Sequence, residues 1–162
     1  MRLKDLTSRD IKKVFWESAK SGYGSNKVEK IRIDELPGYK CILFKSGKFS
    51  VLDAYCVTPL SNKSLGTITI WLDNVPVWVM QYGGFYPKKV VPFLKLALQS
   101  TILNEKFIGG RGPSLFKHKD YPNLSYVNNP EVNDFTIFWG KEWITEDAQP
   151  LGYHYYNGII LI

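Results

Sequence analysis

The sequence predicts an α+β fold in which two helix-plus-antiparallel-meander repeats, about residues 5–85 and 86–162, form a curved antiparallel sheet, or a half-open barrel, packed on two helices. Three observations predict it. Two segments show the helical spacing of apolar residues. The other hydrophobic runs are short and bounded by turn residues. Aromatic residues, which favour sheets, make up 15% of the chain. The length of 162 residues fits a single domain, 1–162.

Each predicted helix carries its own boundary signals. Thr7 and Asp10 have the spacing of a capping box, apolar or small residues then recur on one face, and Gly22 is a plausible end. The second helix is expected after Pro87, with Pro92 in its first turn, where a missing N–H costs nothing. Its broad apolar face up to about residue 103 predicts that it is the more buried helix.

The predicted strands follow each helix and form two meanders. Turn residues at Ser46-Gly47 and Asp73-Asn74 predict hairpins in the first half. A polar loop is expected from Tyr23 to Lys30, before the first meander. The expected strands of the two halves are Tyr39–Phe44, Phe49–Val57, Gly66–Leu72 and Val75–Tyr82, then Leu124–Val127, Asp134–Trp139, Glu142–Ile144, Leu151–Tyr156 and Ile159–Ile162.

A short pattern recurs in the two halves. The segments that begin at Pro76 and Pro150 align in a proline, a tyrosine and a glycine, so that each half is expected to end its last strand at a glycine turn.

Charge and apolar content limit the location and the partners. No apolar run is long enough to span a bilayer or to act as a signal peptide, so a cytoplasmic protein with no membrane partner is expected. The chain is basic, with a formal net charge of +6, and most of the excess lies before residue 82. Four basic residues of the first helix could attract nucleic acid, although a solvated helix face is the favoured interpretation. They are Arg9, Lys12, Lys13 and Lys20.

Arg111 is the first candidate site residue, because it lies within Gly109-Gly-Arg-Gly-Pro113. Glycines allow the backbone to approach a ligand closely, and a guanidinium matches a carboxylate or phosphate. Arg111 could equally pair with an acidic side chain and fix the loop. The spacing matches no nucleotide-binding glycine motif.

Aromatic residues on the predicted strands supply a second candidate feature. Strand alternation places Trp78, Met80 and Tyr82 on one face, near Tyr55 on an earlier strand. This face is either a core wall, which is favoured, or a stacking platform at the edge of a pocket.

Two strand carboxylates, Asp53 and Glu142, are the remaining charged candidates. Arg111 is a partner for Asp53 by charge. The two carboxylates could form an acid/base pair of the glycosidase type, and either could act with His154 in a small hydrolase. His118 and His154 lack metal-ligand spacing, so neither a metal nor another cofactor is expected. The candidate ligand-binding residues are Arg111, Asp53, Tyr55, Trp78, Tyr82, Glu142 and Tyr155.

The order of several elements resembles the bacterial family catalogued as domain of unknown function 5680. The similarity runs from Phe15 to Gly158, and its elements are Gly47-x-Phe49-x-x-x-Asp53-x-Tyr55, the hairpin from Val75 to Gly84, Arg111-Gly-Pro113, Tyr126, and Phe138-x-Gly140-x-Glu142 followed by Tyr153-x-Tyr155-Tyr-x-Gly158. Members stand alone or follow Xre-type helix-turn-helix domains, which implies a sensing or regulatory role. The resemblance implies no activity, and this sequence shows no DNA-reading domain before its first helix.

The leading hypothesis is therefore a bacterial domain that binds a polar or anionic small molecule, or a protein partner, in a regulatory role. A small hydrolase that uses strand carboxylates is one alternative, and a nucleic-acid-associated protein is another. Whether the chain catalyses a reaction stays open at this point.

Overall fold

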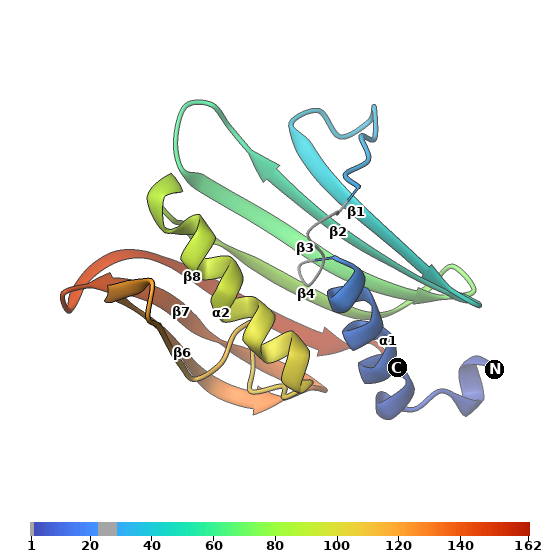
Figure 1. Ribbon diagram of the computed structural model, residues 1–162. Helices are drawn as coiled ribbons and strands as arrows, with labels where there is room; N and C mark the ends of the chain where they lie inside the picture. The colour runs from blue at the N-terminus through green and yellow to red at the C-terminus, as the bar shows by residue number, and fades with distance from the viewer. Residues whose placement is uncertain (1, 23–28) are drawn as a thin grey trace.

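The computed structural model describes residues 2–22 and 29–162, and within them the chain forms two helices and one eight-stranded antiparallel sheet (Figure 1). In chain order the strands are β1 (Tyr39–Ser46), β2 (Phe49–Val57), β3 (Lys63–Leu72), β4 (Val75–Phe85), β5 (Leu115–His118), β6 (Tyr121–Asp134), β7 (Ile137–Glu146) and β8 (Gln149–Ile160). The order across the sheet is β1-β2-β3-β4-β8-β7-β6-β5. The loop expected from Tyr23 to Lys30 lies largely outside the described residues.

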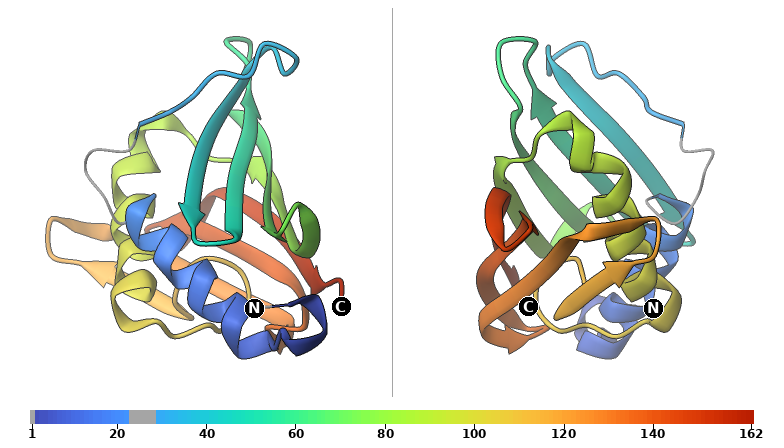
Figure 2. Two further views of the ribbon diagram at one scale, coloured as in Figure 1. Left: turned by 90° about the vertical axis from the view of Figure 1, so that its right-hand side faces the viewer. Right: turned by 60° about the vertical axis from the view of Figure 1, so that its left-hand side comes forward.

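The predicted α+β class is confirmed, and the sheet does not close into a barrel. β1 and β5 are its two edges, and β4 pairs with β8 at its centre. The sheet curves around both helices, which lie on its concave face (Figure 2). Each half runs as a helix followed by four strands. This order fits the predicted pair of repeats, but the repeat organisation stays a prediction.

Helix α1 (Ser8–Ser21) begins and ends where its local signals predict. The Thr7 side chain accepts a hydrogen bond from the Asp10 amide, the Asp10 carboxylate accepts one from the Thr7 amide, and Gly22 is the C-cap. Ile11, Phe15 and other apolar residues of one face are buried against the sheet.

Helix α2 (Val91–Asn104) follows a short 3-10 turn and has Pro92 in its first turn, as predicted. It ends at Glu105, which adopts a left-handed backbone conformation with φ of 48°. Six of its residues are buried, against four of α1, so it is the more buried helix.

The turn between β1 and β2 differs from the expected one by one residue. The two turn residues are Gly47 and Lys48, so that Ser46 lies opposite Phe49 and Cys41 opposite Ala54. Gly47 has φ of 58°, which suits the first central position of a two-residue hairpin turn. The turn was expected one residue earlier, at Ser46-Gly47. Cys41 and Cys56 are free thiols.

The second meander has fewer and longer strands than predicted. The expected strand Asp134–Trp139 instead spans the turn between β6 and β7, and the two strands expected after residue 150 are one, β8. Gly158 was expected to end a strand, but it lies within β8. A glycine is needed at this position because the Phe138 ring on β7 lies where a Cβ would be. β5 was not predicted.

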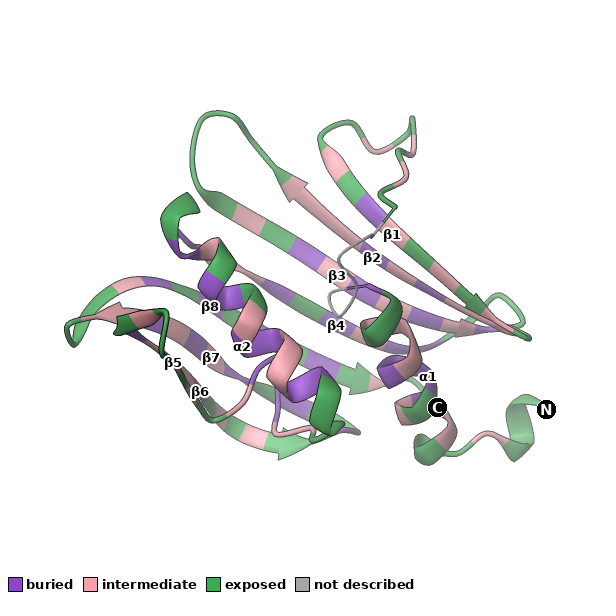
Figure 3. Ribbon diagram, in the orientation of Figure 1, coloured by how far each residue is buried: buried purple, intermediate pink, exposed green. Residues whose placement is uncertain are grey.

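Buried side chains form two apolar clusters between the helices and the sheet. One packs α1 against β2–β4 and includes Trp78, and the other packs α2 against β6 and β7. Buried positions alternate with intermediate ones along β3 and mainly with exposed ones along β8 (Figure 3). In the described part of the chain, neither helix has the length and apolar character needed to cross a membrane.

Candidate functional site

The largest cavity near the predicted site residues, here called the outer cavity, has a volume of about 580 Å³. It lies between α2 and the ends of β2, β3 and β4, and the loop from Thr58 to Asn62 forms part of its rim. Tyr55, Tyr82 and Tyr86 line it, together with apolar side chains of α2.

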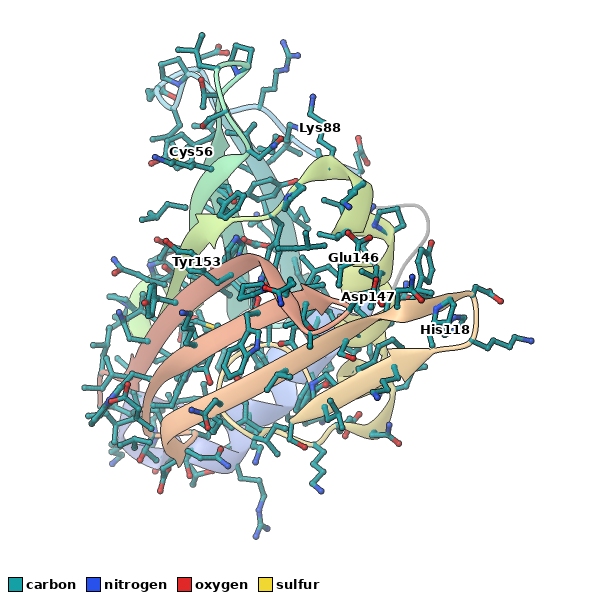
Figure 4. All side chains as sticks on the ribbon, turned by 90° about the vertical axis from the view of Figure 1, so that its left-hand side faces the viewer. Cys56, Lys88, His118, Glu146, Asp147 and Tyr153 are labelled. Carbon is teal, nitrogen blue, oxygen red and sulfur yellow. The ribbon has the colours of Figure 1, made fainter. Side chains whose placement is uncertain are left out.

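The outer cavity has a strongly positive lining. It contains Arg111 and five exposed lysines, and among the described residues no Asp or Glu contributes to its wall. None of these lysines has a carboxylate of the described chain within 4.0 Å. The five, one of which is labelled in Figure 4, are Lys30, Lys40, Lys63, Lys88 and Lys95.

Arg111 lies at the inner end of this cavity, where Glu142, His154 and Tyr82 contact it. Its Nη2 pairs with Oε1 of Glu142 and donates a hydrogen bond of 2.8 Å to Nδ1 of His154. The guanidinium carbon lies 4.3 Å from the centre of the Tyr82 ring, a cation–π arrangement. The Arg111 side chain is 8% exposed. It therefore pairs with an acidic side chain, which was one of the two interpretations open from the sequence.

Glu142 is fully buried on β7, and both of its carboxylate oxygens are bound. Arg111 contacts one, and the hydroxyl of Tyr126 donates a hydrogen bond of 2.7 Å to the other. Burial, followed by the nearby Glu142 charge, raises the pKa of Tyr126 well above its ordinary value, so the hydroxyl stays a donor. Glu142 thus neutralises the charge of Arg111.

His154 lies directly opposite Glu142 in the pairing of β7 with β8. Burial, and then the Arg111 charge, lowers the pKa of His154 from 6.5 to about 2. The ring is consequently neutral near pH 7, and its Nδ1 acts as the acceptor for Arg111. The Tyr86 ring packs against it at a centroid distance of 4.6 Å.

Asp53 is the second buried carboxylate near Arg111. It is 6% exposed on β2 and accepts a hydrogen bond of 2.7 Å from the Tyr82 hydroxyl. Asp53 and Arg111 both line a second, smaller cavity of about 50 Å³, here called the inner cavity. Nine of its thirteen lining residues are apolar, and they come from both helices and from β1, β2 and β3.

The glycines around Arg111 serve internal packing. A Cβ at Gly110 would lie 2.6 Å from a carbon of the Tyr156 ring, and one at Gly112 would lie 2.2 Å from the Tyr126 hydroxyl. The amide of Asn128 donates hydrogen bonds of 2.7 and 3.0 Å to the carbonyl oxygens of Gly109 and Gly112. The close approach expected for a ligand is thus made by the protein's own tyrosines.

A family model for a domain of unknown function, DUF5680, matches residues 60–160. The chain belongs to this family. The resemblance noted in the sequence is thereby confirmed over β3 to β8, and α2 and the Arg111 loop lie within the matched part. No curated protein and no solved structure matches the chain.

In this DUF5680 chain the fold brings together most of the predicted site residues. Arg111, Asp53, Tyr82 and Glu142 form a connected buried cluster, and Tyr55 lines the outer cavity beside it. Sequence reasoning did not find the rim lysines or the loop contacts of Asn128. Asn128 lies on β6, directly opposite Glu142 on β7. Alternation along β6 places it on the same face of the sheet as Glu142, and this was the signal available in the sequence.

Two predicted residues lie elsewhere in this DUF5680 chain. Trp78 is fully buried in the core, where its indole N–H donates to the carbonyl oxygen of Phe135 at 3.2 Å. Tyr155 is 57% exposed and contacts Lys141 and Tyr153. It alternates with the buried His154 and Tyr156, and so points to the outer face of the sheet, as does Tyr153, which is labelled in Figure 4. Among the residues that the structure describes, no three His, Cys, Asp or Glu side chains are grouped as metal ligands.

Proposed function

We propose that this domain binds an anionic small molecule in the outer cavity, in a sensing or regulatory role. The observation that carries the proposal is the lining of that cavity, which combines five lysines and Arg111 with no carboxylate of the described chain. A volume of about 580 Å³ is typical of small-molecule sites.

The electrostatic argument depends on where the neutralising charge lies. Glu142 compensates the charge of Arg111 behind the cavity wall, whereas the five lysines of the outer cavity have no carboxylate partner among the described residues. Like charges gathered in a concave site focus the field and raise the local concentration of anions. The lysines are therefore expected to make the first contacts with the ligand, with the Arg111–Tyr82 stack as the floor.

The hydrolase alternative has one observation in its favour, since Glu142 and His154 meet at Arg111. Two others oppose it. Glu142 has no exposed surface and both its oxygens are bound, so it cannot reach a substrate. A histidine with a pKa near 2 is a poor base at neutral pH. Ligand binding accounts for the site better.

The nucleic-acid alternative relies on the basic face of α1. Two of its four basic residues already form ion pairs, Lys13 with Glu17 and Lys20 with Glu105. That face is separate from the lysines of the outer cavity, so the two hypotheses are distinguishable by mutation.

Titration with pyrophosphate at low salt tests the proposal. Replacement of Lys88 and Lys95 by glutamine is expected to weaken binding about tenfold, the equivalent of about 1.4 kcal/mol. The matched control replaces Lys117 and Lys119, which are exposed near the β5–β6 turn and line neither cavity. Equal weakening in both double variants, or no pyrophosphate binding by the wild-type protein, would contradict the proposal.

A further inference from the structure

The outer and inner cavities share a wall but differ in chemical character. Leu98 of α2 and Arg111 line both of them. On the outer side the wall is surrounded by lysines, and on the inner side it faces mostly apolar side chains of α1 and of the first strands. One ligand that occupied both would need a charged end and an apolar end.

The positions of the charges set the orientation of such a ligand. All five lysines line the outer cavity alone, while the buried carboxylate of Asp53 lines the inner cavity alone. An anionic group next to Asp53 would be repelled in a region of low dielectric constant. The negative end therefore belongs outside, among the lysines, and the neutral end inside.

We propose that the ligand is a phosphate monoester or a similar anion with a short alkyl tail, whose head lies in the outer cavity and whose tail passes between Leu98 and Arg111 into the inner cavity. This inference rests on the proposed function of the outer cavity. The inner cavity of about 50 Å³ has room for about four groups of the size of a water molecule or methylene. A tail of about four or five carbons would fill it.

The energetic consequence is a dependence of affinity on chain length. Burial of each methylene stabilises a complex by about 0.8 kcal/mol, which corresponds to about fourfold in affinity. The dependence should stop once the inner cavity is full, because further carbons would stay in water.

The experiment is a calorimetric titration of the whole chain with n-alkyl phosphates from methyl to octyl. Affinity is expected to rise about fourfold for each carbon up to about pentyl and then to level off. Ala19→Leu, which places three more carbons at the wall of the inner cavity, should flatten the series and leave the affinity for methyl phosphate unchanged. Ile42→Phe on edge strand β1 is a second variant that fills the same cavity from another element.

The control is Ala54→Leu, which makes the same change in size on the opposite face of β2 from Asp53 and lines neither cavity. This variant should keep the wild-type dependence on chain length. A flat series in the wild-type protein, with pyrophosphate still bound, would overturn the inference and leave the proposed function intact. Loss of pyrophosphate binding itself would instead contradict the proposed function.

Discussion

Glu142 and His154 lie directly opposite one another on β7 and β8, and both contact Nη2 of Arg111. One partner is a carboxylate and the other a neutral ring, so the guanidinium receives one compensating charge and one neutral acceptor. Because all three side chains are nearly or fully buried, this arrangement fixes the floor of the outer cavity by contacts that water hardly screens.

Replacement of Arg111 by methionine is expected to destabilise the protein by about 3–5 kcal/mol, because it leaves Glu142 as a buried charge without its cation. The measurement is the free energy of unfolding in urea. Lys48→Met is the matched control, since Lys48 pairs with Asp73 at 2.8 Å but both side chains are about half exposed. Its cost should stay within about 1 kcal/mol.

The Arg111 and Glu142 substitutions should not be additive. In the double variant Arg111→Met, Glu142→Gln neither position carries a buried charge, and the Tyr126 hydroxyl keeps an amide oxygen as acceptor. The double variant is therefore expected to be more stable than Arg111→Met alone. If it is less stable by the sum of the single effects, the pair is not the coupled unit that its geometry indicates.

The lowered pKa of His154 predicts that the protein loses stability in mild acid. This pKa is lowered from 6.5 to about 2 on folding, so between these values the unfolded chain binds a proton that the folded protein does not. Stability from this group is complete above about pH 6.5 and falls as the pH is lowered, by at most about 1.4 kcal/mol per pH unit. Denaturation midpoints at pH 7, 6 and 5 would measure this slope.

The matched variants are His154→Gln and His118→Gln. The first should remove the slope between pH 6.5 and 4.5, while the second, at the last residue of β5, should retain it. The carboxyl groups of Asp10 and Asp134 have pKa values lowered from 3.8, so their contribution is lost only at more acidic pH. A slope that persists without His154 would contradict this assignment.

Local signals predicted the helices and the first meander well. The capping residues of α1, Pro92 in α2 and the Asp73-Asn74 turn act within a few residues of themselves, and each is confirmed. Asp73 and Asn74 both have positive φ, as this type of two-residue hairpin turn requires.

The second meander was predicted less well because its breaker residues lie inside strands. Pro130 and Pro150 are at or beside register irregularities of β6 and β8, where the absent N–H of proline is tolerated. Gly158 is required by the Phe138 ring on the neighbouring strand. A sequence read along one strand does not contain that cross-strand contact.

The individual residues of the site were predictable from the sequence, but the contacts between them were not. Arg111, Asp53 and Glu142 were found because charges in strands or among glycines are unusual. Their partners depend on long-range pairing, since Arg111 lies 31 residues from Glu142 and 43 from His154. The lysines of the outer cavity come from separate elements, so their clustering appears only in the folded chain.

Asn128 is expected to be the residue that holds the Arg111 loop in place. Its side chain is 4% exposed, donates to the carbonyl oxygens of Gly109 and Gly112, and accepts a hydrogen bond of 2.5 Å from the Tyr156 hydroxyl. Asn128→Ala removes all three bonds and leaves buried groups without partners, at about 1–3 kcal/mol each.

Asn128→Asp separates the two roles of this side chain, because a carboxylate still accepts from Tyr156 but cannot donate to the loop carbonyls. Both variants should therefore accelerate amide hydrogen exchange in residues 109–112. The control Asn133→Ala, at an exposed position near the end of β6, should leave this exchange unchanged. Slow exchange that persists in Asn128→Ala would mean that the Arg111–Glu142 pair alone holds the loop in place.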